Sequence, residues 1–177
     1  MSNIFHMNMA NLFVGDDDPS NSLFLTIKNV KLPTFEETTK DHAGGGASGK
    51  VQLGMGLIEP LMPSFQLEGF NPGVQQHFMP AAGRIKYTIR GNVYDLREQT
   101  DLELKAIIQG RLTKMEMGEF TRDAGMTEDY EIKEALFYSI SLGGQEKFYF
   151  DYFSGPAGFR VNGQVVQQRA ARNLGLV

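Results

Sequence analysis

The chain has 177 residues, of which 41% are hydrophobic and 21% charged, values typical of a globular protein with a core of its own. It contains no cysteine, which excludes disulfides and thiol catalysis, and its formal net charge of −4 argues against a protein that grips nucleic acid through its phosphates. No apolar run approaches the roughly 18 residues of a membrane span, and the N-terminus lacks the basic start and apolar core of a signal peptide. We therefore expect neither a membrane segment nor a secretion signal.

The first strand signal lies between residues 23 and 32. Its alternating apolar residues are Leu23, Leu25 and Ile27, followed on the opposite parity by Val30 and Leu32. A period of two is typical of a strand with one buried face, and a change of parity is what a β-bulge produces. We expect a strand over residues 23–32 with a bulge near Asn29.

A segment without large apolar side chains follows this strand. Residues 36–50 contain nothing apolar larger than alanine, and Gly44, Gly45 and Gly46 lie in the middle. Long loops without structure of their own are uncommon in compact domains, and they are usually functional or disordered. We expect residues 33–50 to form a long glycine-rich loop, which is either simply mobile or docks on a neighbouring subunit.

This loop partly matches two phosphate-binding motifs. Residues 44–49 satisfy G-x-G-x-x-G, and Lys50 follows as in a P-loop. Both motifs require a helix after the glycines, and a P-loop also requires Ser or Thr after the lysine. Here Val51 follows, and Val51, Leu53, Met55 and Leu57 alternate as in a half-buried strand. The sequence therefore predicts a strand over residues 51–57 and no nucleotide site.

The middle of the chain predicts a further strand and a short helix. Pro60 and Pro63 interrupt regular structure, and a strand is expected to begin at Phe65. Asn71-Pro72 has the residues preferred at a helix start, so we expect a helix that runs through Phe78 and stops before Pro80.

Residues 84–153 have the pattern of a β-meander with long strands. Apolar alternation predicts strands over about 84–94, 102–117, 130–142 and 148–153, and within the third of these the alternation is broken at Glu134. Gly143-Gly144 is a strong hairpin signal. Strands of this length leave long edges, which closure against neighbouring subunits into a ring-shaped barrel would remove.

The last predicted element is a helix over residues 164–175, which Asn162-Gly163 precedes and Gly175 ends. Without repeats or a linker composition, residues 1–177 are expected to form one domain. The fold class predicted is mainly β: an antiparallel β-sandwich or barrel with two short flanking helices.

No pattern of catalytic or metal-binding residues stands out. His6, His42 and His77 lack the spacing of a metal site. The carboxylate cluster at 16–18 lacks the alternation and glycine of a calcium loop, so a solvated turn is the favoured interpretation. We predict no enzyme activity, no cofactor and no metal.

Several segments share their order and spacing with a known family. They are Asn11–Gly15, Leu32-Pro33-Thr34-Phe35, Ala43–Gly46, Phe65–Gly69, Arg90-Gly91, Gln109–Arg111, Val161–Gly163 and the ending Arg169–Leu176. Through these segments the chain resembles, over nearly its whole length, the major tail tube protein of contractile-tailed bacteriophages. The connection 118–127 and the loop 154–158 depart from the family pattern.

The resemblance implies a structural virion protein, made in the host cytoplasm. Six copies would form a ring whose hairpins make an inner β-barrel, and rings would stack into a hollow tube that conducts the genome. The implied partners are the chain itself, a sheath protein outside, tape-measure protein and then DNA inside the bore without tight binding, and baseplate and tail-terminator proteins.

The glycine-rich loop is the predicted contact between subunits or rings. The candidate residues are Phe35, Glu36, Lys40, Gly44, Gly45, Gly46 and Lys50. Glu131, Lys133 or Glu134, and Lys86 or Arg90, are candidates by parity for the bore. Two alternatives remain: the tube of a phage-tail-like bacteriocin or secretion system, and a monomeric β-barrel module that binds a ligand or peptide.

Overall fold

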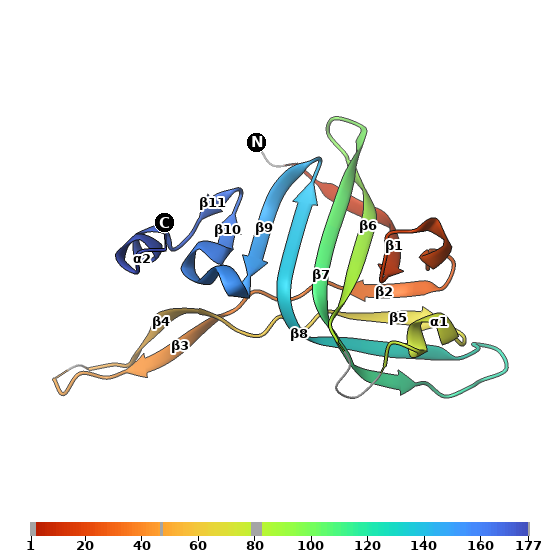
Figure 1. The fold of residues 1–177 in the computed structure, drawn as a ribbon, viewed down its shortest axis with the longest axis horizontal. Helices are drawn as coiled ribbons and strands as arrows, with labels where there is room; N and C mark the ends of the chain where they lie inside the picture. The colour runs from red at the N-terminus through yellow and green to blue at the C-terminus, as the bar shows by residue number, and fades with distance from the viewer. Residues whose placement is uncertain (1–2, 47, 79–82, 177) are drawn as a thin grey trace.

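One antiparallel sheet organises most of the molecule (Figure 1). The computed structural model describes residues 3–46, 48–78 and 83–176. Along the sheet the strands are β1 (Phe5–Val14), β6 (Ile85–Asp95), β7 (Thr100–Met117), β8 (Thr127–Leu142), β9 (Gln145–Asp151), β10 (Phe159–Val161) and β11 (Gln164–Val165). A branch is formed by β5 (Ser64–Glu68), which pairs with the first part of β8, and by β2 (Ile27–Lys31), which pairs with β5.

The sheet folds over itself because β7 and β8 change register in their middle. Gln109 lies opposite Phe137, but Arg111 lies opposite Lys133, so β8 holds extra residues at this point. Glu134, where the predicted alternation breaks, has a positive φ of 50°. Gly110 faces this bulge, and a Cβ there would lie 2.6 Å from the Ile132 side chain. A bulge of this kind bends a strand, so the two halves of the hairpin enclose a common interior.

The core lies between these two halves. Tyr87, Ile108 and Tyr138 project into it from β6, β7 and β8, and they are at most 2% exposed. From the branch and the first part of β8 come Phe65, Leu67, Tyr130 and Ile132, and Phe65 stacks on Tyr130 with ring centroids 4.9 Å apart. The structure confirms a mainly β, antiparallel, sandwich-like fold with short helices, and its described residues form no closed barrel.

Several elements agree with the sequence predictions. β5, β6 and β7 lie where alternation places them, and β7 ends at Met117. Gly143 and Gly144, with φ of 57° and 77°, form the turn between β8 and β9, in backbone conformations that glycine adopts without steric cost. The predicted bulge near Asn29 is confirmed by a register shift between Ile27 and Asn29.

Other predictions were wrong in extent. Residues 24–26 form a turn rather than the start of a strand, so β2 covers only the second half of the predicted range 23–32. The helix predicted over 164–175 is shorter: Asn162-Gly163 turns the chain back into β11, and α2 covers only Gln168–Asn173. Strand β1, which pairs with β6 from Tyr87 to Asp95, was not predicted.

The helix predicted to run from Asn71-Pro72 through Phe78 is shorter: α1 covers only Pro72–Gln75, and residues 76–77 form a turn. Pro80, before which this helix was expected to stop, lies outside the described residues. The Asn71 side chain does not cap it. Instead its amide donates to the carboxylate of Glu128, a residue with no exposed surface. Tyr130 Oη and Gln75 Nε2 also donate to Glu128, so a buried carboxylate ties α1 to β8. A short 3-10 helix covers Pro19–Asn21, and a 3-10 segment over Tyr152–Gly158 is interrupted at Gly155, whose φ is 53°.

Candidate assembly surfaces

A β-hairpin leaves the body of the molecule where a loop was predicted. Strands β3 (Glu37–His42) and β4 (Val51–Ile58) pair only with each other, and they project at one end of the long axis (Figure 1). β4 confirms the strand predicted over 51–57. The expectation of a structureless loop over residues 33–50 was wrong for β3. Its side chains show no apolar alternation, but its backbone pairs with that of β4.

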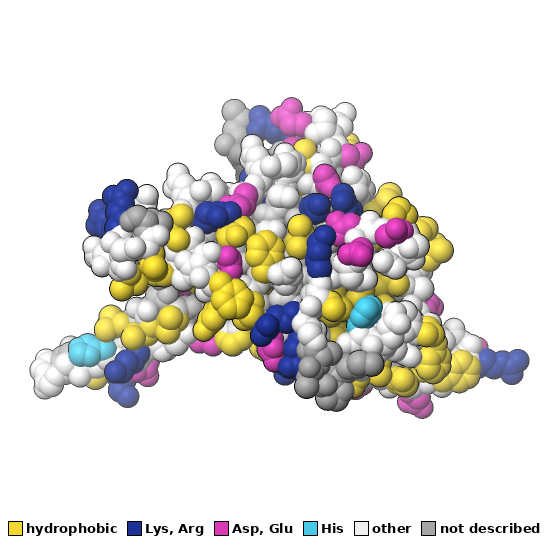
Figure 2. All heavy atoms as spheres, viewed as in Figure 1, with side chains coloured by type: hydrophobic (Ala, Val, Ile, Leu, Met, Phe, Trp, Pro, Cys, Tyr) yellow, Lys and Arg dark blue, Asp and Glu magenta, His cyan; other side chains and the backbone are white. Residues whose placement is uncertain are grey.

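The hairpin exposes a row of apolar side chains. Val51, Leu53, Met55 and Leu57 are 55%, 49%, 51% and 62% exposed, although alternation predicts a strand buried on one face. Figure 2 shows apolar side chains along the hairpin where it leaves the body. A two-stranded hairpin with an apolar face and two unpaired outer edges is a template for association, which proteins ordinarily blunt or cover. This hairpin therefore has the properties of a contact surface.

The predicted contact residues lie along this hairpin and at its base. Lys40 lies directly opposite Leu53, and Gly44–Gly46 and Lys50 lie at the far end between the two strands. Glu36 is exposed at the base, where its carbonyl accepts from the Glu59 amide. Phe35 differs from the others because it packs inside its own subunit, on Tyr138, Phe148 and Phe159.

The base of the hairpin is fixed by polar contacts. Thr38 Oγ1 donates to Glu59, and the Gly56 amide donates to the Glu37 carboxylate. Gln167, just before α2, donates from Nε2 to the Gly56 carbonyl. The hairpin is thus joined to the C-terminal segment as well as to its own two ends.

An apolar groove lies at the opposite end of the long axis, between β1 and β2. It has a volume of about 910 Å³ and is lined by Met7, Met9, Phe24 and Ile27, among others. Met9 and Phe24 are 68% and 60% exposed, and the outer edge of β1 before Leu12 pairs with no described strand. Sequence reasoning missed this surface because β1 itself was not predicted.

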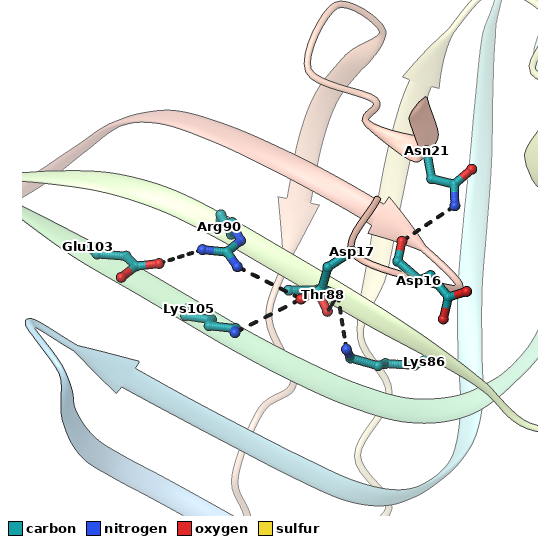
Figure 3. Close-up of polar contacts among 8 residues, drawn as sticks. All are labelled: Asp16, Asp17, Asn21, Lys86, Thr88, Arg90, Glu103 and Lys105. Atoms are coloured by element: carbon teal, nitrogen blue, oxygen red, sulfur yellow. Dashed lines mark hydrogen bonds and ion pairs between the residues drawn. The ribbon is translucent and has the colours of Figure 1, made fainter. Parts of the chain in front are cut away.

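A charged cluster lies on the polar face of β6 and β7 (Figure 3). Lys86, Thr88 and Arg90 share one face of β6, and Lys105 of β7 lies directly opposite Arg90. Asp17, from the loop after β1, accepts from Thr88 Oγ1 at 2.6 Å and from Lys86 Nζ at 3.0 Å. Arg90 and Lys105 approach its other oxygen to 3.8 and 3.9 Å, and Arg90 also pairs with Glu103 at 2.7 Å.

The cluster changes the titration of Asp17. The Thr88 hydroxyl, and then the Lys86 and Lys105 ammonium groups, hold the pKa of the Asp17 carboxyl below its ordinary value, although partial burial opposes this shift. The interpretation of residues 16–18 as a solvated turn was therefore wrong for Asp17. The solvated-turn interpretation fits Asp16 and Asp18 better, since Asp16 is exposed and Asp18 caps the following 3-10 helix. Only the residues that contact Asp17 reveal its role, and the nearest of them in the sequence, Lys86, lies 69 positions away.

The residues suggested for the bore do not form one group. Lys86 and Arg90 belong to the Asp17 cluster, whereas Glu134 pairs with Arg84 and Arg111 at the bulge. Glu131 and Lys133, which precede Glu134 in β8, pair with each other at 3.1 Å.

Other kinds of site find no support in the described residues. The glycines 44–46 are followed by β4 rather than by a helix, so the phosphate-binding motifs lack their structural context. Over residues 3–46, 48–78 and 83–176, no three His, Asp or Glu side chains are grouped to hold a metal ion. Within the same residues, no helix is long and apolar enough to span a membrane.

Comparison with protein families identifies the kind of protein to which these surfaces belong. The family model of phage tail tube protein FII matches residues 6–175, which is nearly the whole chain. No curated protein matches the sequence. The match covers both the hairpin and the groove, and the family is one of structural proteins rather than enzymes. The chain belongs to the phage tail tube protein FII family.

Proposed function

We propose that this chain, acting as a single domain, forms hexameric rings that stack into the hollow inner tube of a contractile phage tail. Membership of the family supports a virion component that assembles with itself into a tube. The finer features are proposals: six-fold rings, the contractile type, passage of the genome through the bore, and synthesis in the host cytoplasm. So are its partners: sheath, tape-measure, baseplate and tail-terminator proteins.

The observation that carries the proposal is the unpartnered hairpin. Its apolar row and both of its edges lack a partner among the described residues, and a second apolar surface lies at the opposite end of the subunit. When two different surfaces of one chain meet, the contact is heterologous, and repetition of that contact builds rings or filaments. We propose that the hairpin of one copy docks in the β1–β2 groove of the next.

Charge also favours a copy of the same chain in the groove. Lys40 and Lys50 on the hairpin form no ion pair among the described residues, and Asp101 at the groove accepts only from the Asn92 amide. When the hairpin docks in the groove of the next copy, Lys40 and Lys50 are available to pair with Asp101 across the contact.

Electron microscopy of the purified protein over a range of concentrations tests assembly. We expect hollow tubes whose cross-sections average to six-fold symmetry. A protein that stays monomeric at every concentration would contradict self-assembly, and rings of another symmetry would contradict the hexamer. Removal of residues 44–49 should abolish tubes, and normal tubes from that deletion would contradict the role of the hairpin.

Engineered cysteines test the docking because the native chain has none. A Leu53→Cys variant and a larger, tagged Met9→Cys variant are mixed under assembly conditions and oxidised. We expect a disulfide-linked heterodimer that Leu53→Cys does not form with the matched control Phe120→Cys, which is 70% exposed in the β7–β8 connection. Tubes without the Leu53–Met9 crosslink would disprove the groove as receptor while leaving tube formation intact.

A further inference from the structure

The Asp17 cluster has the composition of an anion-binding site. Three cations and one hydroxyl converge on a single carboxylate, from two neighbouring strands and across one face (Figure 3). The Thr88 residue is fully buried, so its hydroxyl is fixed in direction. Such a set of donors also suits a phosphate group, whose oxygens accept several charge-assisted hydrogen bonds.

The Asp17 carboxylate satisfies the four donors around it less well than a phosphate group would. Its two oxygens serve four donors, and two of the cations remain at 3.8 and 3.9 Å, beyond hydrogen-bond distance. Arg90 and Lys105 lie directly opposite each other, an arrangement in which like charges repel. Without Asp17, the only acidic partner left to Lys86, Arg90 and Lys105 among the described residues would be Glu103, and these three cations would form a half-exposed basic patch.

The chain holds Asp17 in place by fixing the loop that carries it. The Gly15 amide donates to the Lys86 carbonyl at 2.8 Å, and Asn11 and Ser22 join the two ends of the loop through their side chains. Asp18 caps the 3-10 helix Pro19–Asn21 by accepting from the Ser20 amide. The position of the Asp17 carboxylate is therefore set by the fold, and its side chain is 24% exposed at the surface.

We propose that the Lys86–Thr88–Arg90–Lys105 cluster is a phosphate site that Asp17 permanently occupies, so that the backbone of DNA is not retained on this face. The proposal rests on the proposed function only in that DNA passes the assembled protein. Retention of DNA depends on the number of phosphates that cations neutralise, and the loss of this one carboxylate would expose three cations to them.

The test compares two neighbouring substitutions of equal charge. Asp17→Asn unmasks the cluster, whereas Asp16→Asn removes the same charge from an exposed side chain outside it. Binding of each full-length protein to a fluorescent DNA duplex is measured by anisotropy at several salt concentrations, with protein kept below the concentration at which sedimentation detects tubes. We expect Asp17→Asn to bind about tenfold more tightly than Asp16→Asn at low salt, with a steeper dependence on salt.

Further variants tie the effect to the cluster. Asp17→Glu retains the carboxylate and is expected to bind as weakly as the wild type. Adding Lys86→Gln and Lys105→Gln to Asp17→Asn should remove the gained affinity. Asp17→Ser, a smaller neutral residue, provides a second unmasked variant if Asp17→Asn does not fold.

Several outcomes would overturn the proposal. One is equal DNA affinity of the Asp17→Asn, Asp17→Ser and Asp16→Asn proteins, and another is a gain that persists after both lysines are removed. A third arm replaces DNA with inorganic phosphate at matched ionic strength, and strong phosphate binding without DNA binding would overturn the assignment to DNA. Because all measurements use unassembled protein, failure here is distinct from failure to form tubes.

Discussion

Strands β7 and β4 share one sequence pattern but differ in what covers their apolar face. In β7, Ala106 and Ile108 belong to an alternating apolar run that only Ile107 interrupts, and both are completely buried because the sheet folds over them. In β4, Val51 and Leu53 alternate in the same way, yet both remain about half exposed because, among the described residues, β4 pairs only with β3 and its apolar row stays uncovered. Alternation thus predicts a strand, but the cover of its apolar face can come from another molecule.

The strongest test of this comparison is a truncation in the core. Ile108→Ala removes a side chain with no exposed surface and leaves a cavity, so we expect a loss of about 2–5 kcal/mol in the free energy of unfolding. Urea unfolding followed by circular dichroism measures it. Leu53→Ala in β4 is the matched control, and a comparable loss there would contradict the view that Leu53 lies outside the core.

The next effect concerns the buried carboxylate of Glu128. Glu128→Gln keeps the shape but brings an amide donor against Tyr130, Gln75 and Asn71, which are all donors, so at least one polar group loses its partner. We expect a loss of about 1–3 kcal/mol by the same unfolding measurement. Glu116→Gln, whose side chain is 60% exposed, is the control, and equal losses would show that burial of Glu128 is not what matters.

A smaller effect is expected at Asp17. Asp17→Asn weakens charge-assisted bonds to Thr88 and Lys86, and should cost about 1–2 kcal/mol at pH 7. Because the folded-state pKa of Asp17 lies below the ordinary value of an aspartate, this contribution is fully present above the unfolded pKa and is lost as pH falls through the folded pKa. Unfolding at pH 7 and at pH 3 should therefore show the wild type and variant converge in acid. A constant difference would contradict ionisation as the cause.

The smallest change in stability is expected on the hairpin. Leu53→Gln leaves the core untouched, so the free energy of unfolding should change by less than about 0.5 kcal/mol. Tube formation, followed by sedimentation, should nevertheless require a higher protein concentration. Phe120→Gln is the control for an exposed apolar residue elsewhere, and unimpaired assembly of the Leu53 variant would show that the apolar row is not an interface.

The elements predicted correctly are those whose pattern depends on near neighbours in the chain. β6 and β7 follow from alternation, and the turn at Gly143-Gly144 follows from backbone freedom. β3 was missed because Glu37–His42 has no apolar residues and owes its structure to pairing with β4. The C-terminal helix was overextended because a local helical pattern competes with the pairing of Gln164–Val165 on β10.

The candidate surfaces were less accessible to sequence reasoning. The residues of the hairpin were singled out, but the exposure of its apolar face depends on the absence of any covering element within the chain. Asp17 acts on Lys86 and Lys105, and nothing near it in sequence indicates those partners. Such contacts are set by the fold as a whole, and so they became visible only with the structure.

The hydrogen bond from Gln167 to Gly56 gives the hairpin a mechanical role. The two legs of the hairpin run into the body beside Pro33 and Leu61, which are both buried. The two legs and Gln167 thus attach the hairpin to the body at three places. Gln167 and its partner Gly56 lie 111 positions apart in the sequence. A pull on the hairpin tip would therefore be shared between the core and the C-terminal segment.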